Sequence, residues 1–313
     1  MGIIIGVLSG MLWGLNDVFA NIYSQQALVN NTTLAVIILA LFLSLMQDAF
    51  SCASIFGYHH FKGTFKKNLK QNKKSFLLLC VAAICAGPLG MVAGIVGIAY
   101  AGPVYAGVIT SCYPVVALLL AIVFLRERPT RLKIMGIILS VISVIFISIA
   151  GERSGITNIS IGLLFAVCAM IGWGMESILF SVAAKKTDQD TSWLLAVRQF
   201  CSAISYVVIL SVLFYVKKGQ FIAMLQGVFL PLLILGCVVT AATSYLAYYH
   251  AIKRIGPSLG TTFNASFIFW AGIFSVLFHI ASLHASFIAW GSVLILGIYF
   301  ASSGTFKAQK MLV

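Results

Sequence analysis

The stretch GIIIGVLSGMLWGLND, residues 2–17, decides the fold, because a second stretch of the chain repeats its pattern. The second stretch is GLLFAVCAMIGWGMES, residues 162–177. A shift of 160 positions places Trp13 on Trp173 and Gly14 on Gly174. Both stretches lie in apolar segments of the length needed to cross a membrane, about 20 residues. A repeat of this kind is typical of transporters built from two related halves.

Apolar segments of similar length follow one another along the whole chain. Hydrophobic residues make up 61% of the 313 residues and charged residues only 9%, whereas a soluble domain has about 25% charged residues. The segments do not alternate with a period of two, which excludes a β-barrel. The ten predicted spans are residues 2–22, 33–57, 75–99, 103–125, 132–150, 160–183, 192–216, 228–252, 257–281 and 285–305. The sequence therefore predicts an all-α integral membrane protein with one transmembrane domain, residues 1–313.

The net charge of +13 is distributed unevenly among the predicted loops. With ten spans, 16 of the 20 Lys and Arg residues fall on one side of the membrane and three on the other, and the last, Arg198, lies inside a span. Cytoplasmic loops carry such an excess of positive charge. We therefore expect both termini in the cytoplasm and the bilayer, rather than a nucleic acid, as the partner of this basic chain.

A second repeat supports the division into halves. Gly-Pro at residues 102–103 matches Gly-Pro at residues 256–257, and the same shift of 154 places Tyr113 on Phe267. Each half has five spans, and five is odd, so the second half enters the membrane from the opposite side. The sequence predicts an inverted repeat, residues 1–150 and 157–306, with a substrate site near the middle of the membrane between the halves.

Several further motifs are spread over both halves in order. They are AGPLGM at 86–91, Tyr-Pro at 113–114, GWGMES at 172–177, Arg-Gln at 198–199, SYLAYY at 244–249 and NASFIFW at 264–270. With the Trp-Gly and Gly-Pro pairs, they resemble the EamA-type carriers of the drug/metabolite transporter (DMT) superfamily over nearly the whole chain. A narrower resemblance is to the LicB-type bacterial choline importers. The sequence departs from that pattern at Asn16-Asp17, and Glu127 has Ala281 at its aligned position where many superfamily members have a second Glu.

The resemblance implies a secondary-active carrier in the bacterial cytoplasmic membrane that imports choline or a similar quaternary amine. The residues themselves agree with a cationic substrate. Trp13 with Asn16, and Trp173 with Glu176, are each three positions apart and so share a helix face. Aromatic faces suit a quaternary ammonium group, which carries its charge diffusely, and one carboxylate balances the charge. The predicted substrate-binding residues are Trp13, Asn16, Tyr113, Trp173, Glu176, Tyr245, Tyr249, Asn264 and Trp270, although each aromatic residue has packing as its alternative role.

Asp48 and Arg198 lie at similar depth in the second and seventh predicted spans. Ionisable groups inside a membrane are costly and by default functional. An Asp48–Arg198 ion pair is expected, either as a gate that breaks during transport or as a static link between two helices. Asp17 faces the cavity or lies near the outer surface, and the sequence does not decide between these positions.

Other functions are weighed against import. An exporter of amino acids or other small metabolites has the same fold, with Arg198 as the partner of a carboxylate. A membrane enzyme needs a nucleophile with its base or a metal cluster, and a channel needs a repeated filter motif; neither is visible in the sequence. The seven cysteines show no metal-ligand spacing. We therefore expect no enzyme activity, no cofactor and no metal site, and the sequence leaves the oligomeric state open.

Overall fold

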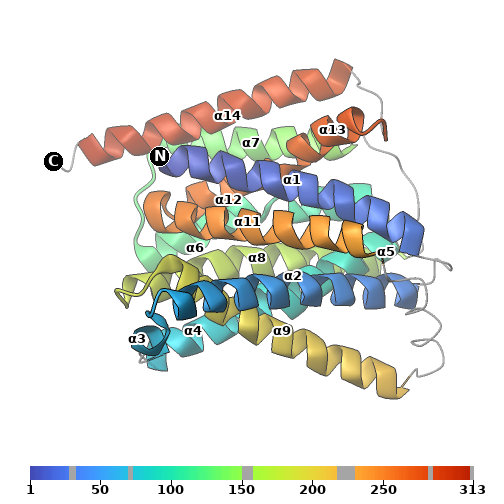
Figure 1. Ribbon diagram of the computed structural model, residues 1–313. Coiled ribbons are helices and arrows are strands. Elements are labelled where there is room, and N and C mark those ends of the chain that lie inside the picture. Colours follow the sequence, from blue (N-terminus) through green and yellow to red (C-terminus); the bar gives the residue numbers. More distant parts are fainter. Residues whose placement is uncertain (28–32, 70–72, 150–157, 217–229, 281–284, 311–313) are drawn as a thin grey trace.

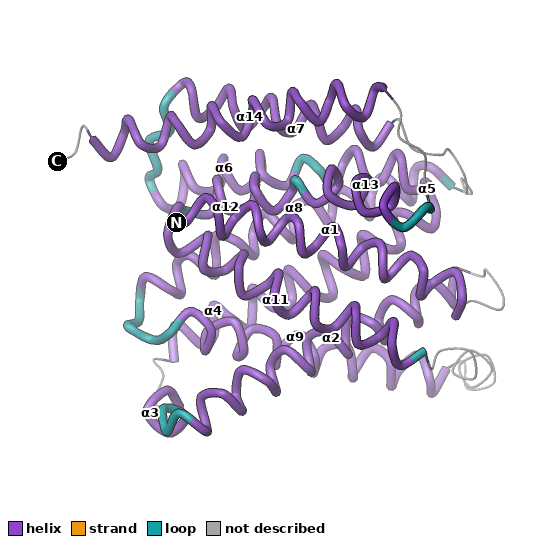
Figure 2. Tube along the Cα trace, turned by 45° about the horizontal axis from the view of Figure 1, so that its top comes forward, coloured by secondary structure: helices purple, strands orange, loops and turns teal. Residues whose placement is uncertain are grey.

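The computed structural model is a bundle of helices that run along one common direction (Figure 1). It describes residues 1–27, 33–69, 73–149, 158–216, 230–280 and 285–310. Figure 2 shows helices joined by short connections and no strand in these ranges. The helices of the first half are α1 (Gly2–Ala27), α2 (Thr33–Phe61), α3 (Phe65–Leu69), α4 (Lys73–Ile84), the π-helix η1 (Cys85–Val92), α5 (Ala93–Thr110), α6 (Tyr113–Leu125) and α7 (Arg131–Ile149). Those of the second half are α8 (Ile159–Lys185), α9 (Thr191–Val216), α11 (Pro231–Ile255), α12 (Pro257–Ala265), α13 (Phe267–Leu277) and α14 (Ala285–Lys310).

Nine helical stretches within the described ranges are long and apolar enough to cross a membrane. They are Gly2–Tyr23, Leu34–Phe61, Ser75–Ile98, Tyr105–Leu125, Ile159–Lys185, Thr191–Val216, Pro231–Ile255, Pro257–Leu277 and Ala285–Ser303. These nine correspond one to one with nine of the ten predicted spans. The remaining predicted span, residues 132–150, coincides with helix α7, which has 19 residues. The chain is therefore an all-helical membrane protein.

The helices form three layers in Figure 1. The upper layer holds α14 and α7, which pack along each other. The middle layer holds α1, α11, α12, α6 and α8, and the lower layer holds α2, α4 and α9. Within and between these layers α1 packs on α11, α5 on α8, and α2 on α9. The middle layer is thus enclosed on two sides, and this position suits a buried site.

The chain turns back between the third and fourth predicted spans. Gly90 in η1 and Tyr113 at the start of α6 both lie against the same side chain, Trp173 of α8. Ala101, between them in sequence, instead meets Gly162, eleven residues before Trp173 on α8. Two antiparallel segments therefore pass Trp173, as the predicted boundary near residue 102 requires.

Two of the segments are interrupted within the bundle. Helix α5 ends at Thr110 and α6 begins at Tyr113, while α12 ends at Ala265 and α13 begins at Phe267. The starts of α6 and α13 are 154 positions apart, which is the shift that aligns the two Gly-Pro pairs. Each break leaves backbone groups free of their usual helical partners, and such backbone is tolerated at membrane depth where it is buried in protein or lines a cavity.

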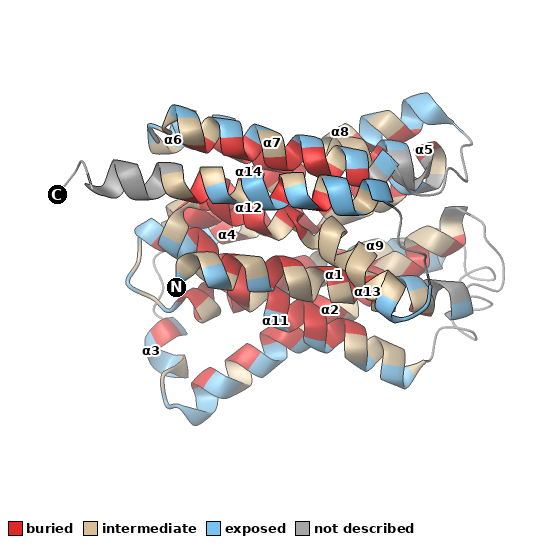
Figure 3. Ribbon diagram, turned by 90° about the horizontal axis from the view of Figure 1, so that it is seen from above, coloured by how far each residue is buried: buried red, intermediate tan, exposed pale blue. Residues whose placement is uncertain are grey.

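Burial follows the requirements of a lipid environment. Figure 3 shows buried positions concentrated on the inward faces and exposed ones on the outer faces of α7 and α14. Large apolar side chains are exposed on the outside, such as Phe124 (67%) and Leu232 (84%). Soluble monomers rarely expose apolar patches of this extent, so lipid chains are the natural neighbours of this surface.

The start of α1 and the end of α14 lie at the same end of the bundle in Figure 1. That end also carries α3 and the connection between α8 and α9, where lysines gather at residues 62, 66, 67, 185 and 186. Lys70, Arg153, Lys217 and Lys218, which contribute to the predicted loop asymmetry, lie outside the described residues. The described lysines agree with the predicted loop arrangement, because one end of the bundle holds this basic group together with the start of α1 and the end of α14.

Candidate functional site

A cavity lies in the middle of the bundle, where both halves contribute to its wall. The lining residues come from α1, η1, α6, α8, α9, α11, α12 and α13, and they are Trp13, Ala86, Met91, Tyr113, Trp173, Glu176, Arg198, Tyr245, Tyr248, Asn264 and Phe267. Six predicted substrate-binding residues therefore line one cavity: Trp13, Tyr113, Trp173, Glu176, Tyr245 and Asn264.

Aromatic rings form most of the wall of this cavity. Trp13 lies against Tyr245, with 5.1 Å between the ring centroids, and Trp173 lies against Tyr113 at 6.0 Å. The two tryptophans that the repeat aligns are thus each placed beside a tyrosine. Edge-to-face and tilted arrangements of this kind are favourable for aromatic pairs, so each of these tryptophans is supported by a neighbouring ring.

Gly90 makes room for one of these rings. A Cβ atom added at Gly90 would overlap the indole Nε1 and Cδ1 of Trp173. Only glycine lets η1 approach the indole this closely. The predicted motif at 86–91 therefore has a local physical reason, since it determines the position of Trp173 at the cavity.

Three buried charged side chains lie at one edge of the cavity. Arg198 donates from Nη1 to both carboxylate oxygens of Asp48, at 3.4 and 3.3 Å. Its Nε lies 3.6 Å from Oε1 of Glu176, too far for a good hydrogen bond. Arg198 and Asp48 are each 2% exposed and Glu176 is 3% exposed. With both acids ionised the group carries one net negative charge, which the low-dielectric surroundings leave poorly screened.

The predicted Asp48–Arg198 ion pair is present in the structure. Whether it opens during transport stays a prediction. Glu176 and Arg198 line the cavity, whereas Asp48 is not among its lining residues. Asp17 is half-buried on α1 and does not line the cavity either. The carboxylate that faces the cavity is therefore that of Glu176.

A neutral polar group occupies another part of the wall, at the two helix breaks. Tyr113 shares its one hydroxyl proton between Oδ1 of Asn264, at 2.9 Å, and the carbonyl of Thr261, at 3.1 Å. Asn264 in turn donates weakly to Ser9 Oγ at 3.5 Å. These contacts connect α6 with α12 and α1, so residues of both halves meet around the cavity.

Three predicted binding residues lie elsewhere. Asn16 is buried and donates to the carbonyl of Cys237 at 3.0 Å, while its own Oδ1 accepts from Gln47 at 3.2 Å. Trp270 packs against Phe269, with centroids 5.6 Å apart, and is not a lining residue. For Asn16 and Trp270 the structure thus gives packing and hydrogen-bonding roles outside the cavity wall.

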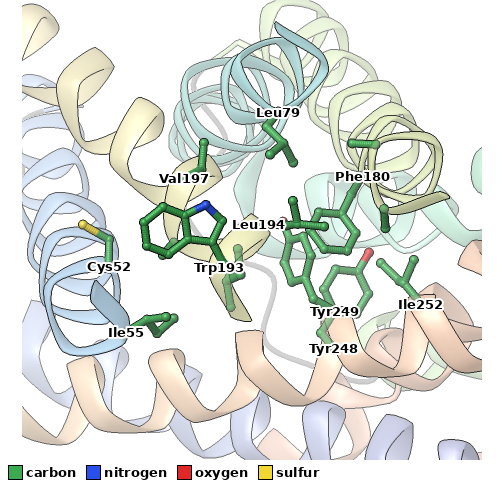
Figure 4. Close-up of a cluster of buried hydrophobic side chains, with 14 residues drawn as sticks. Cys52, Ile55, Leu79, Phe180, Trp193, Leu194, Val197, Tyr248, Tyr249 and Ile252 are labelled. Atoms are coloured by element: carbon green, nitrogen blue, oxygen red, sulfur yellow. The ribbon is translucent and has the colours of Figure 1, made fainter. Parts of the chain in front are cut away.

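The third is Tyr249, which Figure 4 shows inside a cluster of buried apolar side chains. Its ring meets Phe180 edge-on at 4.1 Å. The neighbouring Tyr248 lines the cavity in its place. The spacing alone does not show whether Tyr248 or Tyr249 lines the cavity, because positions three and four after Tyr245 both share its helix face. The rotation of α11 about its own axis determines which ring reaches the cavity.

Ala86 and Met91 were not predicted as site residues. They lie in η1, whose wider turns include Pro88. A π-helical turn often marks a functional site, and proline removes a backbone donor within it. The AGPLGM motif was the available signal, although sequence alone does not show which of its side chains face the cavity. No group of three or more potential metal ligands is found among the described residues.

Comparison with known proteins agrees with this architecture. Residues 1–149 match the EamA-like transporter family. Protein LicB of Haemophilus influenzae is 27% identical over 276 residues, which cover 86% of each chain. A protein of known crystal structure superposes with a TM-score of 0.72 at 14% identity, over 98% of each chain. The last similarity concerns the fold alone.

Proposed function

We propose that this chain, whose residues 1–149 match the EamA-like transporter family, imports choline or a similar quaternary amine by alternating access. The match to this family and the similarity to Protein LicB indicate a membrane transporter and not an enzyme. The similarity to Protein LicB extends through both halves.

The cavity carries the proposal. A quaternary ammonium group has no N–H to donate, so it gains little from hydrogen-bond acceptors and more from aromatic faces, at roughly 0.5–2 kcal/mol each. Trp13, Trp173, Tyr245 and Tyr248 supply such faces around one space. Glu176 supplies the balancing negative charge at its edge. This combination of rings with one cavity-facing carboxylate fits a monovalent organic cation.

The proposed architecture is two inverted five-helix repeats, residues 1–150 and 157–306, in ten spans. Helix packing supports it, because the contacts between helices of the two halves occur in corresponding sets. The α1–α11 pairing corresponds to that of α8 with α4, η1 and α5, while α6 on α8 corresponds to α12 and α13 on α1. The pairs α2–α9 and α7–α14 correspond to themselves. A pseudo-two-fold axis relating the halves would pass beside the cavity, where such transporters bind their substrates.

The proposed orientation places both termini in the cytoplasm, on the side of the lysine-rich connections. Uptake of a cation then runs with the inside-negative potential, by about 2.3 kcal/mol per 100 mV for each charge. The substrate passes from the outer side to the inner side as the halves rock around the cavity.

An exporter of amino acids is the second candidate, because Arg198 lines the same cavity and a carboxylate substrate needs a cation. The guanidinium, however, already faces Asp48 and Glu176. A substrate carboxylate would have to compete with both acids, and the observation therefore favours a cationic substrate.

Uptake of radiolabelled choline into proteoliposomes containing the purified protein tests the proposal. We expect saturable uptake that an imposed inside-negative potential increases. Unlabelled tetramethylammonium should compete, and neutral amino acids should not. Liposomes that take up an amino acid but no choline would favour the second candidate.

A further inference from the structure

We propose that Arg198 is a tethered cation that occupies the ammonium subsite of the empty transporter, and that the substrate displaces it from Glu176 towards Asp48. The inference rests on the proposed function, because it concerns the occupant of the same cavity. It gives Asp48 a role as a positioning residue that never touches substrate.

The contacts of Arg198 are those expected of a bound organic cation. Its guanidinium carbon lies 5.4 Å from the ring centroid of Tyr245 and 6.0 Å from that of Tyr249. Its Nε is 3.6 Å from Glu176. An aromatic face together with a carboxylate is what a quaternary ammonium requires, so the side chain and the substrate compete for Tyr245 and Glu176, which both line the cavity.

The two contacts of Arg198 with acids are unequal. The hydrogen bonds from Nη1 reach both oxygens of Asp48. Neither Arg198 Nε nor Glu176 Oε1 has a hydrogen-bond partner among the described residues. The Asp48 contact is therefore the firmer one, and the Glu176 contact is the one that a substrate can replace without breaking a hydrogen bond.

The charge count agrees with displacement. Two carboxylates and one guanidinium leave one negative charge when the acids are ionised. A single monovalent cation neutralises the group, provided that Arg198 stays with Asp48 and Glu176 pairs with the substrate. Without Asp48, the guanidinium would pair with Glu176 alone, and no negative charge would remain for the substrate.

Choline binding by four purified forms of the protein, measured by calorimetry, tests this order of events. For Asp48→Asn we expect choline affinity to fall by at least about tenfold. Arg198 then loses its buried carboxylate partner and pairs with Glu176, which is no longer available to the substrate. For Arg198→Gln we expect affinity equal to or higher than that of the wild type. The double variant Asp48→Asn/Arg198→Gln has the wild-type net charge and leaves Glu176 free, so its affinity should return to the wild-type level or exceed it.

Two results of this experiment would overturn the inference. If Asp48 and Arg198 only hold α2 and α9 together, the double variant binds no better than Asp48→Asn, and that result overturns the inference. Unchanged affinity in Asp48→Asn also overturns it. Asp188→Asn, which removes an exposed carboxylate, is the matched control and should bind like the wild type.

Arg198→Lys serves if a neutral variant fails to fold. An ammonium is a compact point charge without the planar fork of arginine, so it cannot reach the two acids through separate nitrogens as Arg198 does with Nη1 and Nε. We expect Lys at this position to remain with Asp48 and choline affinity to be at least that of the wild type. A tenfold loss would overturn the inference. Absence of choline binding by the wild type would instead overturn the proposed function, and this inference with it.

Discussion

Tyr113 and Asn264 are joined by a 2.9 Å hydrogen bond between the two interrupted segments of the bundle. Tyr113 begins α6, and Asn264 lies in the last turn of α12. One residue belongs to each half, so this bond and the one to the carbonyl of Thr261 connect the halves directly beside the cavity.

Replacing Tyr113 by Phe removes that connection and keeps the ring. We expect a loss of about 0.5–1.5 kcal/mol in stability for the missing hydrogen bonds, seen as a lower midpoint in thermal unfolding of the detergent-solubilised protein. Choline affinity should change less than this, because the aromatic face remains. Tyr105→Phe, at a half-exposed tyrosine on α5, is the control. An equal effect of the two substitutions would argue against the bond as a link between halves.

Glu176→Gln keeps the shape of the side chain and removes its charge. The remaining pair, Asp48 with Arg198, is neutral, and the cavity then has no negative charge for the substrate. We expect choline uptake to fall by more than about tenfold, in keeping with the loss of a buried charge partner. Unchanged KM and kcat in proteoliposomes would remove the Glu176 carboxylate from the mechanism.

Gly90→Ala introduces the Cβ atom that overlaps the indole of Trp173. Overpacking in a tight interior costs about 1–3 kcal/mol, and the overlap displaces the indole from its present position at the cavity. We expect reduced choline affinity together with a lower thermal midpoint.

Gly57→Ala is the matched control, because no heavy atom lies within 4 Å of a Cβ added there. It is also helical, so alanine should stabilise α2 by up to about 0.5–1 kcal/mol. A Gly90→Ala variant that transports like Gly57→Ala would show that the indole does not need its present position.

Glu127 accepts from Lys133 and from Ser258, the second residue of α12. Lys133 is 5% exposed, so Glu127→Gln leaves a buried ammonium without its carboxylate. We expect a stability loss of about 1–3 kcal/mol, measured by thermal unfolding. Asp188→Asn removes an exposed carboxylate and should have almost no effect. A similar midpoint for both variants would mean that the Glu127 contact contributes little.

Cys80 on α4 and Cys201 on α9 have their sulfur atoms 3.3 Å apart. This separation is close enough for a mild oxidant such as copper phenanthroline to join them with little backbone movement. We expect a Cys80–Cys201 linked peptide in mass spectrometry after proteolysis of oxidised protein. Cys80→Ser should abolish it. Failure of the wild type to cross-link would contradict the packing of α4 on α9.

Much of the architecture was predictable because membrane helices are read from length and hydropathy. The repeat aligned Trp13 with Trp173, and both side chains line the cavity. Glu176 was identified because a carboxylate inside a span needs a reason. These predictions depend on which residues occur at a given depth, and the sequence carries that information directly.

The remaining details depend on helix rotation and on local breaks. Tyr248 and Tyr249 differ by one position, and only the packing of α11 decides that Tyr249 meets Phe180. Asn16 lies nearly one helical turn after Trp13, yet its side-chain amide does not face the cavity and is hydrogen-bonded to Gln47 and to the carbonyl of Cys237. The break at Ser266 has no Gly or Pro beside it. Neighbouring groups in the folded bundle compete for packing and hydrogen-bond partners, and this competition determines these features. The pattern of residues along the sequence does not contain that information.

The interruptions in the helices have a mechanical consequence. The π-helix η1, the start of α6 and the end of α12 gather around Trp173 and Tyr113 at one depth. A regular helix resists bending because every residue is held by its backbone ladder, and loss of ladder bonds creates a joint. We therefore expect the bundle to bend at this level, so that the portions on one side of the aromatic cavity rotate while those on the other side stay in place.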